Sequence, residues 1–135
     1  MLCSELMNRD VKLISEREST ARAAEIMRDN DIGFIPVYDE NRQKLVGTVT
    51  DRDIAIRLVG EHKPMDTPVS EVMTRNLIFC HANEDVTEAR ELMESHQLSR
   101  MIVLDDQDKI VGIISLGDLS GDDETGETLA VIKEP

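Results

Sequence analysis

Aromatic residues are almost missing from this sequence, in which Phe34, Tyr38 and Phe79 are the only ones. A protein that binds single-stranded nucleic acid by stacking needs aromatic faces beside a basic groove. The chain has neither, and its formal net charge of -13 at pH 7 would repel a phosphate backbone. We therefore expect no nucleic acid among its partners.

Cysteine and long apolar runs are scarce as well. Cys3 and Cys80 are too few for a disulfide framework, and their spacing fits no common zinc motif. No apolar run approaches the roughly 18 residues that a membrane span needs. The first residues lack the basic start and apolar stretch of a signal peptide. The sequence thus predicts a reduced, cytoplasmic protein without a membrane partner.

Catalytic and metal-binding patterns are also absent. The sequence holds no Gly-x-Ser-x-Gly, no metal-hydrolase motif and no evident set of nucleophile, base and orienting residue. Three histidines and Cys80 invite a metal interpretation, but Cys80 and His81 are adjacent, and neighbours rarely point to one metal. His62 falls in a polar stretch and His96 at an expected helix end. We expect no enzyme, no resident metal and no cofactor.

What the sequence does contain is an internal repeat. Ser4-Glu5-Leu6-Met7 returns 66 residues later as Ser70-Glu71-Val72-Met73, and Ala23–Met27 returns at the same offset as Ala89–Met93. A further block, Leu45-Val46-Gly47, returns at an offset of 65 as Ile110-Val111-Gly112, which places a one-residue deletion in a polar turn. Such a period indicates two copies of one structural unit.

Both copies predict the order strand, helix, strand, strand, helix. Apolar and β-branched runs predict the strands, and apolar residues at helical spacing predict the first helix of each copy. The expected elements of the first copy are strand 11–14, helix 19–30, strands 33–37 and 45–49, and a helix beginning near 51; those of the second are strand 77–80, helix 85–95, strands 101–104 and 110–114, and a helix beginning near 116.

Neither copy is long enough to bury much surface alone, so we expect the two to pack through their small sheets with the helices outside. This is an α/β (α+β) fold of two β-α-β-β-α repeats related by pseudo-symmetry. The expected boundaries are 1–59 for the first repeat, 60–68 for a linker with Pro64 and Pro68, 69–119 for the second repeat, and 120–135 for an acidic C-terminal tail.

This order of motifs resembles a tandem pair of CBS (cystathionine-β-synthase-type) domains. The pieces that carry the resemblance are Ser70–Thr74, the Ala-x-x-x-Met helices, Ile35-Pro36-Val37 and above all Leu45–Ile54. The resemblance covers about residues 3–119 and is closest to small stand-alone CBS proteins. It implies a regulatory module that binds an adenosine compound (AMP, ADP, ATP or S-adenosylmethionine) in clefts between the repeats, often as a homodimer, and that acts on an unknown partner.

The resemblance also implies which residues form the sites. The family's Gly-h-x-Thr/Ser-x-x-Asp motif, where h is apolar, occurs twice here, and its hydroxyl meets phosphate while its carboxylate grips the ribose diol. A carboxylate suits a cis-diol, and a hydroxyl with backbone amides at a helix start suits phosphate. The first copy holds Gly47, Thr50 and Asp53 and the second Gly112, Ser115 and Asp118; Ile14, Ser15, Cys80 and His81 would line the base, and the segments Gly33-Phe34-Ile35-Pro36 and Ser99-Arg100-Met101-Ile102 would close over it.

Two arginines make the expected clefts unequal. Arg52 has Gly117 as its counterpart, and Arg100 has Phe34. Each arginine is a candidate phosphate partner, although either could be a solvated surface residue. We call the two segments that would close over the base, 33–36 and 99–102, the first and second lip. Ile102 in the second lip replaces Pro36 in the first, which weakens the case that the second lip is rigid. The charge of the chain favours AMP over nucleotides with more phosphates, and it makes S-adenosylmethionine, with its positive sulfonium, the main rival.

Other interpretations of the same residues stay open. Thr50 and Asp53, like Ser115 and Asp118, also fit a capping box at a helix start, a role compatible with ligand binding. The whole module could be a structural interaction protein with vestigial clefts. Ligand calorimetry separates these possibilities, and elemental analysis tests a metal-binding protein.

Overall fold

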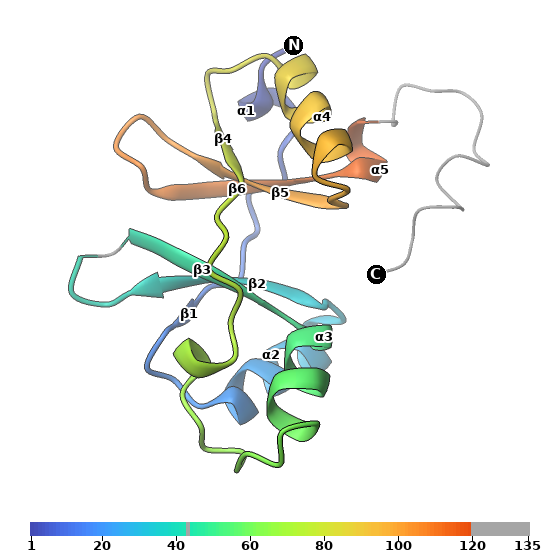
Figure 1. Ribbon diagram of the computed structural model, residues 1–135. Helices are drawn as coiled ribbons and strands as arrows, with labels where there is room; N and C mark the ends of the chain where they lie inside the picture. Colours follow the sequence, from blue (N-terminus) through green and yellow to red (C-terminus); the bar gives the residue numbers. More distant parts are fainter. Residues whose placement is uncertain (43, 120–135) are drawn as a thin grey trace. The chain divides into compact units, whose positions relative to one another are not determined.

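The computed structural model describes residues 1–42 and 44–119, so the expected acidic tail at 120–135 lies outside the described residues. The fold is mixed α+β, with two three-stranded sheets flanked by short helices (Figure 1). None of the described helices is long and apolar enough to cross a membrane. The elements are α1 (Cys3–Leu6), β1 (Ile14–Ser15), α2 (Thr20–Asn30), β2 (Phe34–Asp39), β3 (Lys44–Thr50), α3 (Asp51–Asp53), the π-helix η1 (Ile54–Val59), the 3-10 helix η2 (Val69–Glu71), β4 (Phe79–His81), α4 (Val86–Ser95), β5 (Arg100–Leu104), β6 (Ile110–Ser115) and α5 (Leu116–Leu119).

Two compact units make up the chain, and they do not coincide with the two sequence repeats. One unit, the continuous unit, is Lys12–Leu77. The other, the split unit, joins Met1–Val11 to the described residues from Ile78 on. Each unit therefore holds the sheet and helices of one repeat and the first residues of the other, which we call its leading segment. The leading segment of the first repeat is Met1–Val11, in the split unit, and that of the second is 69–77, in the continuous unit. The repeat boundaries 1–59 and 69–119 remain a prediction about the sequence.

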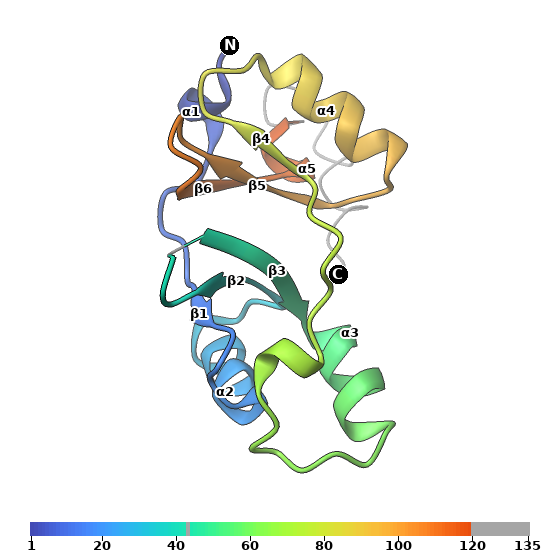
Figure 2. The ribbon, with the colours of Figure 1, turned by 60° about the vertical axis from the view of Figure 1, so that its left-hand side comes forward.

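The sheet of the continuous unit has the order β1-β2-β3, with β1 parallel and β3 antiparallel to β2. Helix α2 covers one face of this sheet (Figure 2). Ser19 begins α2 by accepting the backbone N–H of Arg22, and Asp31 ends it in the left-handed region at φ 55°. Apolar side chains from the sheet and α2 form the core, including Ile35, Val37 and Val49, none of which is exposed.

The split unit repeats this plan with the order β4-β5-β6, again with one parallel and one antiparallel pair. Asp85 caps α4 by accepting the backbone N–H of Thr87, and that bond holds the pKa of the carboxyl below its usual value. Helices α4 and α5 lie on the same face of the sheet (Figures 1 and 2). The core beneath them contains Met93, Met101 and Ile114.

The leading segments attach to the two units in the same way. In the split unit the N–H groups of Cys3 and Ser4 donate to the carbonyls of Glu84 and Ala82, at 2.8 and 2.9 Å. In the continuous unit Val69 and Ser70 make the equivalent bonds to Glu18 and Glu16, at 2.8 and 3.0 Å. Arg9 and Arg75, which are also 66 residues apart, each donate to the carbonyl of the serine five residues earlier. The repeat in sequence is thus a repeat in hydrogen bonding.

The predicted element order is confirmed, with differences at the ends. Strand β1 begins three residues later than expected, since Leu13 is 39% exposed and only Ile14 and Ser15 pair with β2. Strand β4 is likewise displaced, to Phe79–His81. The short helices α1 and η2 at the leading segments were not predicted, and the second helix of the first repeat continues from α3 into π-helical turns.

Candidate ligand-binding site

Both copies of the Gly-h-x-Thr/Ser-x-x-Asp motif lie where a strand runs directly into a helix. The backbone N–H of Thr50 donates to Asp53 Oδ2 at 3.0 Å, and the N–H of Asp53 donates back to Thr50 Oγ1 at 3.0 Å. Ser115 and Asp118 make the same two bonds at 2.9 and 3.2 Å. The capping-box interpretation is therefore confirmed at both junctions. Each hydroxyl accepts a hydrogen bond there, which leaves its own proton available to donate.

Both carboxylate oxygens of Asp53 accept hydrogen bonds from neighbouring residues. Asp53 is 8% exposed, and Thr74 Oγ1 donates to its Oδ1 at 3.1 Å. Arg57 Nη1 lies 3.9 Å from the same oxygen and donates to the carbonyl oxygen of Met73 at 2.9 Å. Asp53 thus joins the end of β3 to the leading segment of the second repeat. A ligand hydroxyl at this carboxylate would compete with Thr74.

Asp118 is in a different position. It is half-buried, and its Oδ2 accepts the Ser115 backbone N–H, but no described residue contacts its Oδ1. The residue that corresponds to Thr74 in the repeat is Asn8, whose backbone pairs with Ile113 as that of Thr74 pairs with Thr48, but whose side-chain Oδ1 accepts the backbone N–H of Asp10. Among the described residues, one carboxylate oxygen and one hydroxyl proton at the second junction therefore have no hydrogen-bond partner.

The motif glycines are explained by close packing. A Cβ on Gly47 would lie 2.6 Å from the carbonyl oxygen of Thr74 and 2.9 Å from Met73 Sδ. At Gly112 the nearest atoms all belong to the side chain of Met7. In both units the methionine of the leading segment packs where the motif lacks a side chain. Glycine here admits the segment from the other repeat, and it is not required by a left-handed backbone.

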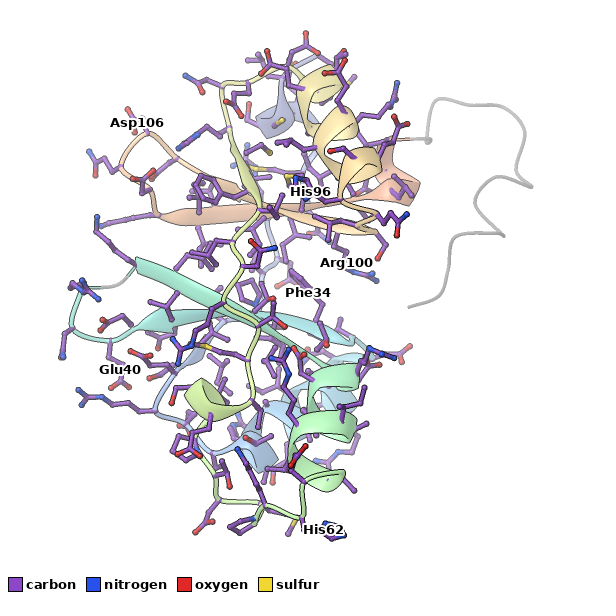
Figure 3. All side chains as sticks on the ribbon, in the orientation of Figure 1. Phe34, Glu40, His62, His96, Arg100 and Asp106 are labelled. Atoms are coloured by element: carbon purple, nitrogen blue, oxygen red, sulfur yellow. The ribbon has the colours of Figure 1, made fainter. Side chains whose placement is uncertain are left out.

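The two lip segments place their side chains on alternate faces of each sheet. Ile35 on β2 and Met101 on β5 point into the hydrophobic cores and are fully buried. Phe34 and Arg100 lie on the faces opposite the helices (Figure 3), and the pleat places Pro36 and Ile102 on those same faces. Of these four side chains, that of Phe34 is half-buried and that of Arg100 is exposed, whereas those of Pro36 and Ile102 are as fully buried as the core pair.

Gly33 is the first residue of the first lip and lies against helix α3, which begins within the motif. Its carbonyl accepts the backbone N–H of Asp51 at 3.0 Å, and a Cβ at Gly33 would lie 2.8 Å from Asp51 Oδ2. The same backbone bond occurs in the split unit, where Leu116 donates to the carbonyl of Ser99. The start of each lip is therefore fastened to the strand–helix junction of its own unit.

The residues proposed to line the base fall in two environments. Ile14 is 3% exposed and belongs to the core, and Cys80 is 1% exposed and contacts Cys3, so their side chains face inward. Ser15 is buried, and its Oγ accepts the backbone N–H of Arg17 at 3.1 Å. His81 is half-buried, with Nε2 3.0 Å from Asp108 Oδ1.

A surface hollow of about 570 Å³ lies beside β4 and α4, apart from the motif residues. Only His81 among the candidate residues lines it. Its ring stands edge-on to Phe79, with centroids 5.6 Å apart. The remaining lining residues are mostly acidic, namely Glu84, Glu88 and Glu91, with Leu92 and Ser95.

Arg52 and Arg100 are both exposed. Arg52 makes no ion pair with a described residue, and Arg100 only approaches Ser99 Oγ, at 3.5 Å. Each is free to neutralise a phosphate near its own junction. Within the described residues, no group of three or more histidine, cysteine or acidic side chains is arranged to hold a metal ion.

Two residues at the first junction were not predicted from the sequence, namely Thr74 and Arg57. Thr74 stands in the repeated Ser-Glu-Val-Met-Thr block, and its counterpart in the first copy is Asn8. That difference between the copies was the available signal, because it falls in the segment that meets the motif carboxylate. Arg57 has a counterpart only at a position beyond the described residues.

Comparison with known proteins shows the family of the chain. The CBS domain family model matches the chain twice, over residues 3–60 and 69–121. The CBS domain-containing protein YhcV of Bacillus subtilis is 36% identical over 122 residues, which is 90% of this chain and 85% of YhcV.

Two solved structures are similar. Hypoxic Response Protein I, crystallised with two coordinated zinc ions, gives a TM-score of 0.80 at 29% identity, covering 90% of this chain and 98% of that one. The CBS domain pair of protein MJ0100, in complex with 5'-methylthioadenosine and S-adenosyl-L-methionine, gives 0.77 at 31% identity, covering 90% and 94%. With two matched repeats and relatives that align over nearly their whole length, the chain belongs to the CBS domain family as a tandem pair.

Proposed function

We propose that the chain is a regulatory module, not an enzyme, that binds an adenosine-containing ligand with its ribose on the Ser115–Asp118 junction. The observation that carries the proposal is that Oδ1 of Asp118 accepts no hydrogen bond from any described residue, while Oδ2 is held in place by the cap. Support also comes from the MJ0100 pair, a similar structure that was solved with two adenosine compounds.

The ribose suits this junction for a chemical reason. A cis-diol presents two hydroxyl protons side by side, and a carboxylate accepts both as charge-assisted hydrogen bonds. The capping bonds fix the carboxylate before the ligand arrives, so little side-chain freedom is lost on binding. The Ser115 hydroxyl keeps a proton that can be donated to a phosphate oxygen.

The base and the phosphate would be held by side chains on the helix-free faces of the sheets. Phe34 is half-buried and offers an aromatic ring to a purine, whereas Pro36 and Ile102 are fully buried and offer it little surface. Arg100 is an exposed cation within the second lip, and Arg52, also exposed, belongs to the first junction. A single arginine near each junction matches one phosphate better than three.

AMP is therefore the favoured ligand. A formal charge of -13 disfavours highly charged anions at long range, and the acidic residues at the junctions add to that field. In calorimetry without magnesium, we expect affinity to fall in the order AMP, ADP, ATP. Raising the salt concentration should weaken AMP binding little, because screening reduces both the global repulsion and the local attraction. Tightest binding of ATP in magnesium-free buffer would contradict the charge argument.

S-adenosylmethionine is the second candidate, since its sulfonium is attracted by an acidic protein and the MJ0100 pair was solved with it. The titration should include it, on wild type and on Arg52→Ala and Arg100→Ala. Binding of S-adenosylmethionine alone, indifferent to both arginine changes, would replace AMP in the proposal. No binding of any adenosine compound would leave a structural module with vestigial sites.

We further propose that the chain is a homodimer. Ile56 and Val59 on η1 are 47% and 65% exposed, which leaves apolar surface for a second copy to cover. Light scattering at micromolar concentration should return about twice the monomer mass of 15.2 kDa. An Ile56→Asp/Val59→Asp variant should return the monomer mass, with the exposed Arg17 changed in Arg17→Asp as a control for the added negative charge. A wild type that is monomeric with and without AMP would disprove the dimer.

A further inference from the structure

Two thiols that the proposed ligand site does not use lie in contact inside the split unit. The Sγ atoms of Cys3 on α1 and Cys80 on β4 are 3.6 Å apart, and the two residues are 0% and 1% exposed. They are 77 positions apart in the sequence and are the only cysteines of the chain. Cys3 and Cys80 meet because the leading segment of the first repeat packs with the sheet of the second repeat.

The geometry points to a redox modification site. We propose that a hydroperoxide converts Cys3 and Cys80 into an intrachain disulfide that fastens the leading segment Met1–Val11 to β4. Sulfur atoms already in van der Waals contact reach the bonding distance of about 2 Å through a small side-chain movement. Because the chain has no third cysteine, no other intrachain disulfide competes.

The oxidation balances with hydrogen peroxide as the oxidant. One thiolate attacks an oxygen of the peroxide, the O–O bond breaks, and the products are a sulfenic acid and, after proton transfer, water. The sulfur of the second cysteine then displaces the hydroxyl of the sulfenic acid, which leaves as a second water once it is protonated. Two thiols are oxidised by two electrons, and one peroxide is reduced to two waters.

The closed fold keeps this reaction slow. Burial raises the pKa of both thiols, so little thiolate is present while α1 is docked. Docking depends on a one-turn helix, on the bonds from Cys3 and Ser4 to the loop before α4, and on the two backbone bonds between Asn8 and Ile113. Opening of this short segment admits the oxidant, and its return brings the sulfenic acid against the second thiol.

The disulfide would act on the candidate site through β6. Met7 packs against Gly112, the first residue of the Gly112–Asp118 motif, and Asn8 pairs with Ile113 in the next position. Once Cys3 is bonded to Cys80, the segment cannot leave β6 for long. Oxidation thus stabilises the backbone that leads to Ser115 and Asp118, whichever ligand that junction binds.

The test uses the wild-type chain treated with hydrogen peroxide and then with an alkylating reagent under denaturing conditions. Intact mass spectrometry should show a monomer that has lost two hydrogen atoms and takes up no alkyl group, and proteolysis should give one cross-linked peptide containing residues 3 and 80. The melting temperature should rise by about 10 °C and return to its starting value with dithiothreitol.

Cys3→Ala and Cys80→Ala are the matched controls, each expected to show no cross-link and no peroxide-dependent rise. Three results would each overturn the proposal. These are alkylation of both cysteines after peroxide treatment, accumulation of sulfinic acid on one cysteine without a cross-link, and disulfides only between chains. All three are measured on the wild type, so the proposal remains testable if an alanine variant folds poorly.

Discussion

Replacing Gly47 by alanine is expected to destabilise the chain by about 1–3 kcal/mol, the usual cost of overpacking, with a fall in melting temperature of roughly 5–10 °C. The new methyl group would lie 2.6 Å from the carbonyl oxygen of Thr74. That oxygen accepts the N–H of Thr48, and the N–H of Thr74 donates to Thr48 in return, at 2.9 and 2.7 Å. The backbone cannot yield without weakening both bonds.

Gly112→Ala is the matched comparison. The three nearest atoms to a Cβ there belong to the side chain of Met7, which is flexible and stands on a short segment. We expect a smaller loss of stability for Gly112→Ala than for Gly47→Ala. Shortening the methionine should relieve the clash in the double variant Gly112→Ala/Met7→Ala, whereas Met73→Ala should not relieve Gly47→Ala.

The measurement is thermal unfolding of Gly47→Ala, Gly112→Ala and their double variants with Met73→Ala and Met7→Ala. Each double variant is compared with its single methionine variant. The pattern depends on which atom the new methyl group meets, backbone oxygen in one unit and side-chain sulfur in the other. If Gly47→Ala is as stable as wild type, the leading segment of the second repeat does not pack on β3 as described. The same conclusion follows if Met73→Ala fully relieves it.

Local patterns predicted the helices and the longer strands well. Helix α2 begins directly after Ser19 and α4 directly after Asp85, within one residue of the starts that the apolar spacing predicted. Strands β2, β3, β5 and β6 follow the apolar runs to within two residues. These elements depend on periodicity and on caps, which are properties of neighbouring residues.

Local sequence patterns could not predict which segments pair over long distances in the sequence. β1 is a strand only over the two residues that β2 pairs, so the apolar run before it was a poor guide. Which repeat receives each leading segment depends on bonds such as Cys3 to Glu84 and Val69 to Glu18, and neither repeat alone contains that information. Short apolar runs identify buried segments without naming their partners.

The sequence predicted two unequal junctions, but it did not predict the difference between the contacts of their two carboxylates. Both capping boxes follow from Thr50 and Ser115 standing three residues before an aspartate. Thr74 reaches Asp53 because the leading segment of the second repeat packs in the continuous unit. The hydrogen bond between them could therefore not be predicted from the motif itself. From the sequence the first junction was the stronger candidate; the contacts of Asp53 and Asp118 favour the second.

The two junctions should therefore respond differently to the same substitution. Asp118→Asn keeps an oxygen that can accept the Ser115 N–H, so the cap survives, but it loses the second acceptor and the charge. Losing hydrogen bonds to a charged acceptor costs about 1.5–3 kcal/mol, and AMP affinity should fall roughly 10- to 150-fold with little change in melting temperature. Asp53→Asn should lower the melting temperature, because it weakens the contacts with Thr74 and Arg57, and should change AMP affinity less than about threefold.

Thr74→Val separates competition at the first junction from a simple absence of binding there. Valine matches the shape of threonine but cannot donate to Asp53 Oδ1, so that oxygen, like its counterpart on Asp118, no longer accepts a hydrogen bond from a described residue. In calorimetry on Thr74→Val we expect a second AMP binding event, and the event should disappear again in Thr74→Val/Asp53→Asn. Equal losses of AMP affinity in Asp53→Asn and Asp118→Asn would contradict the assignment of the ribose to the second junction. A Thr74→Val variant that stays folded but binds no additional AMP would show that occupation of Asp53 is not what closes the first junction.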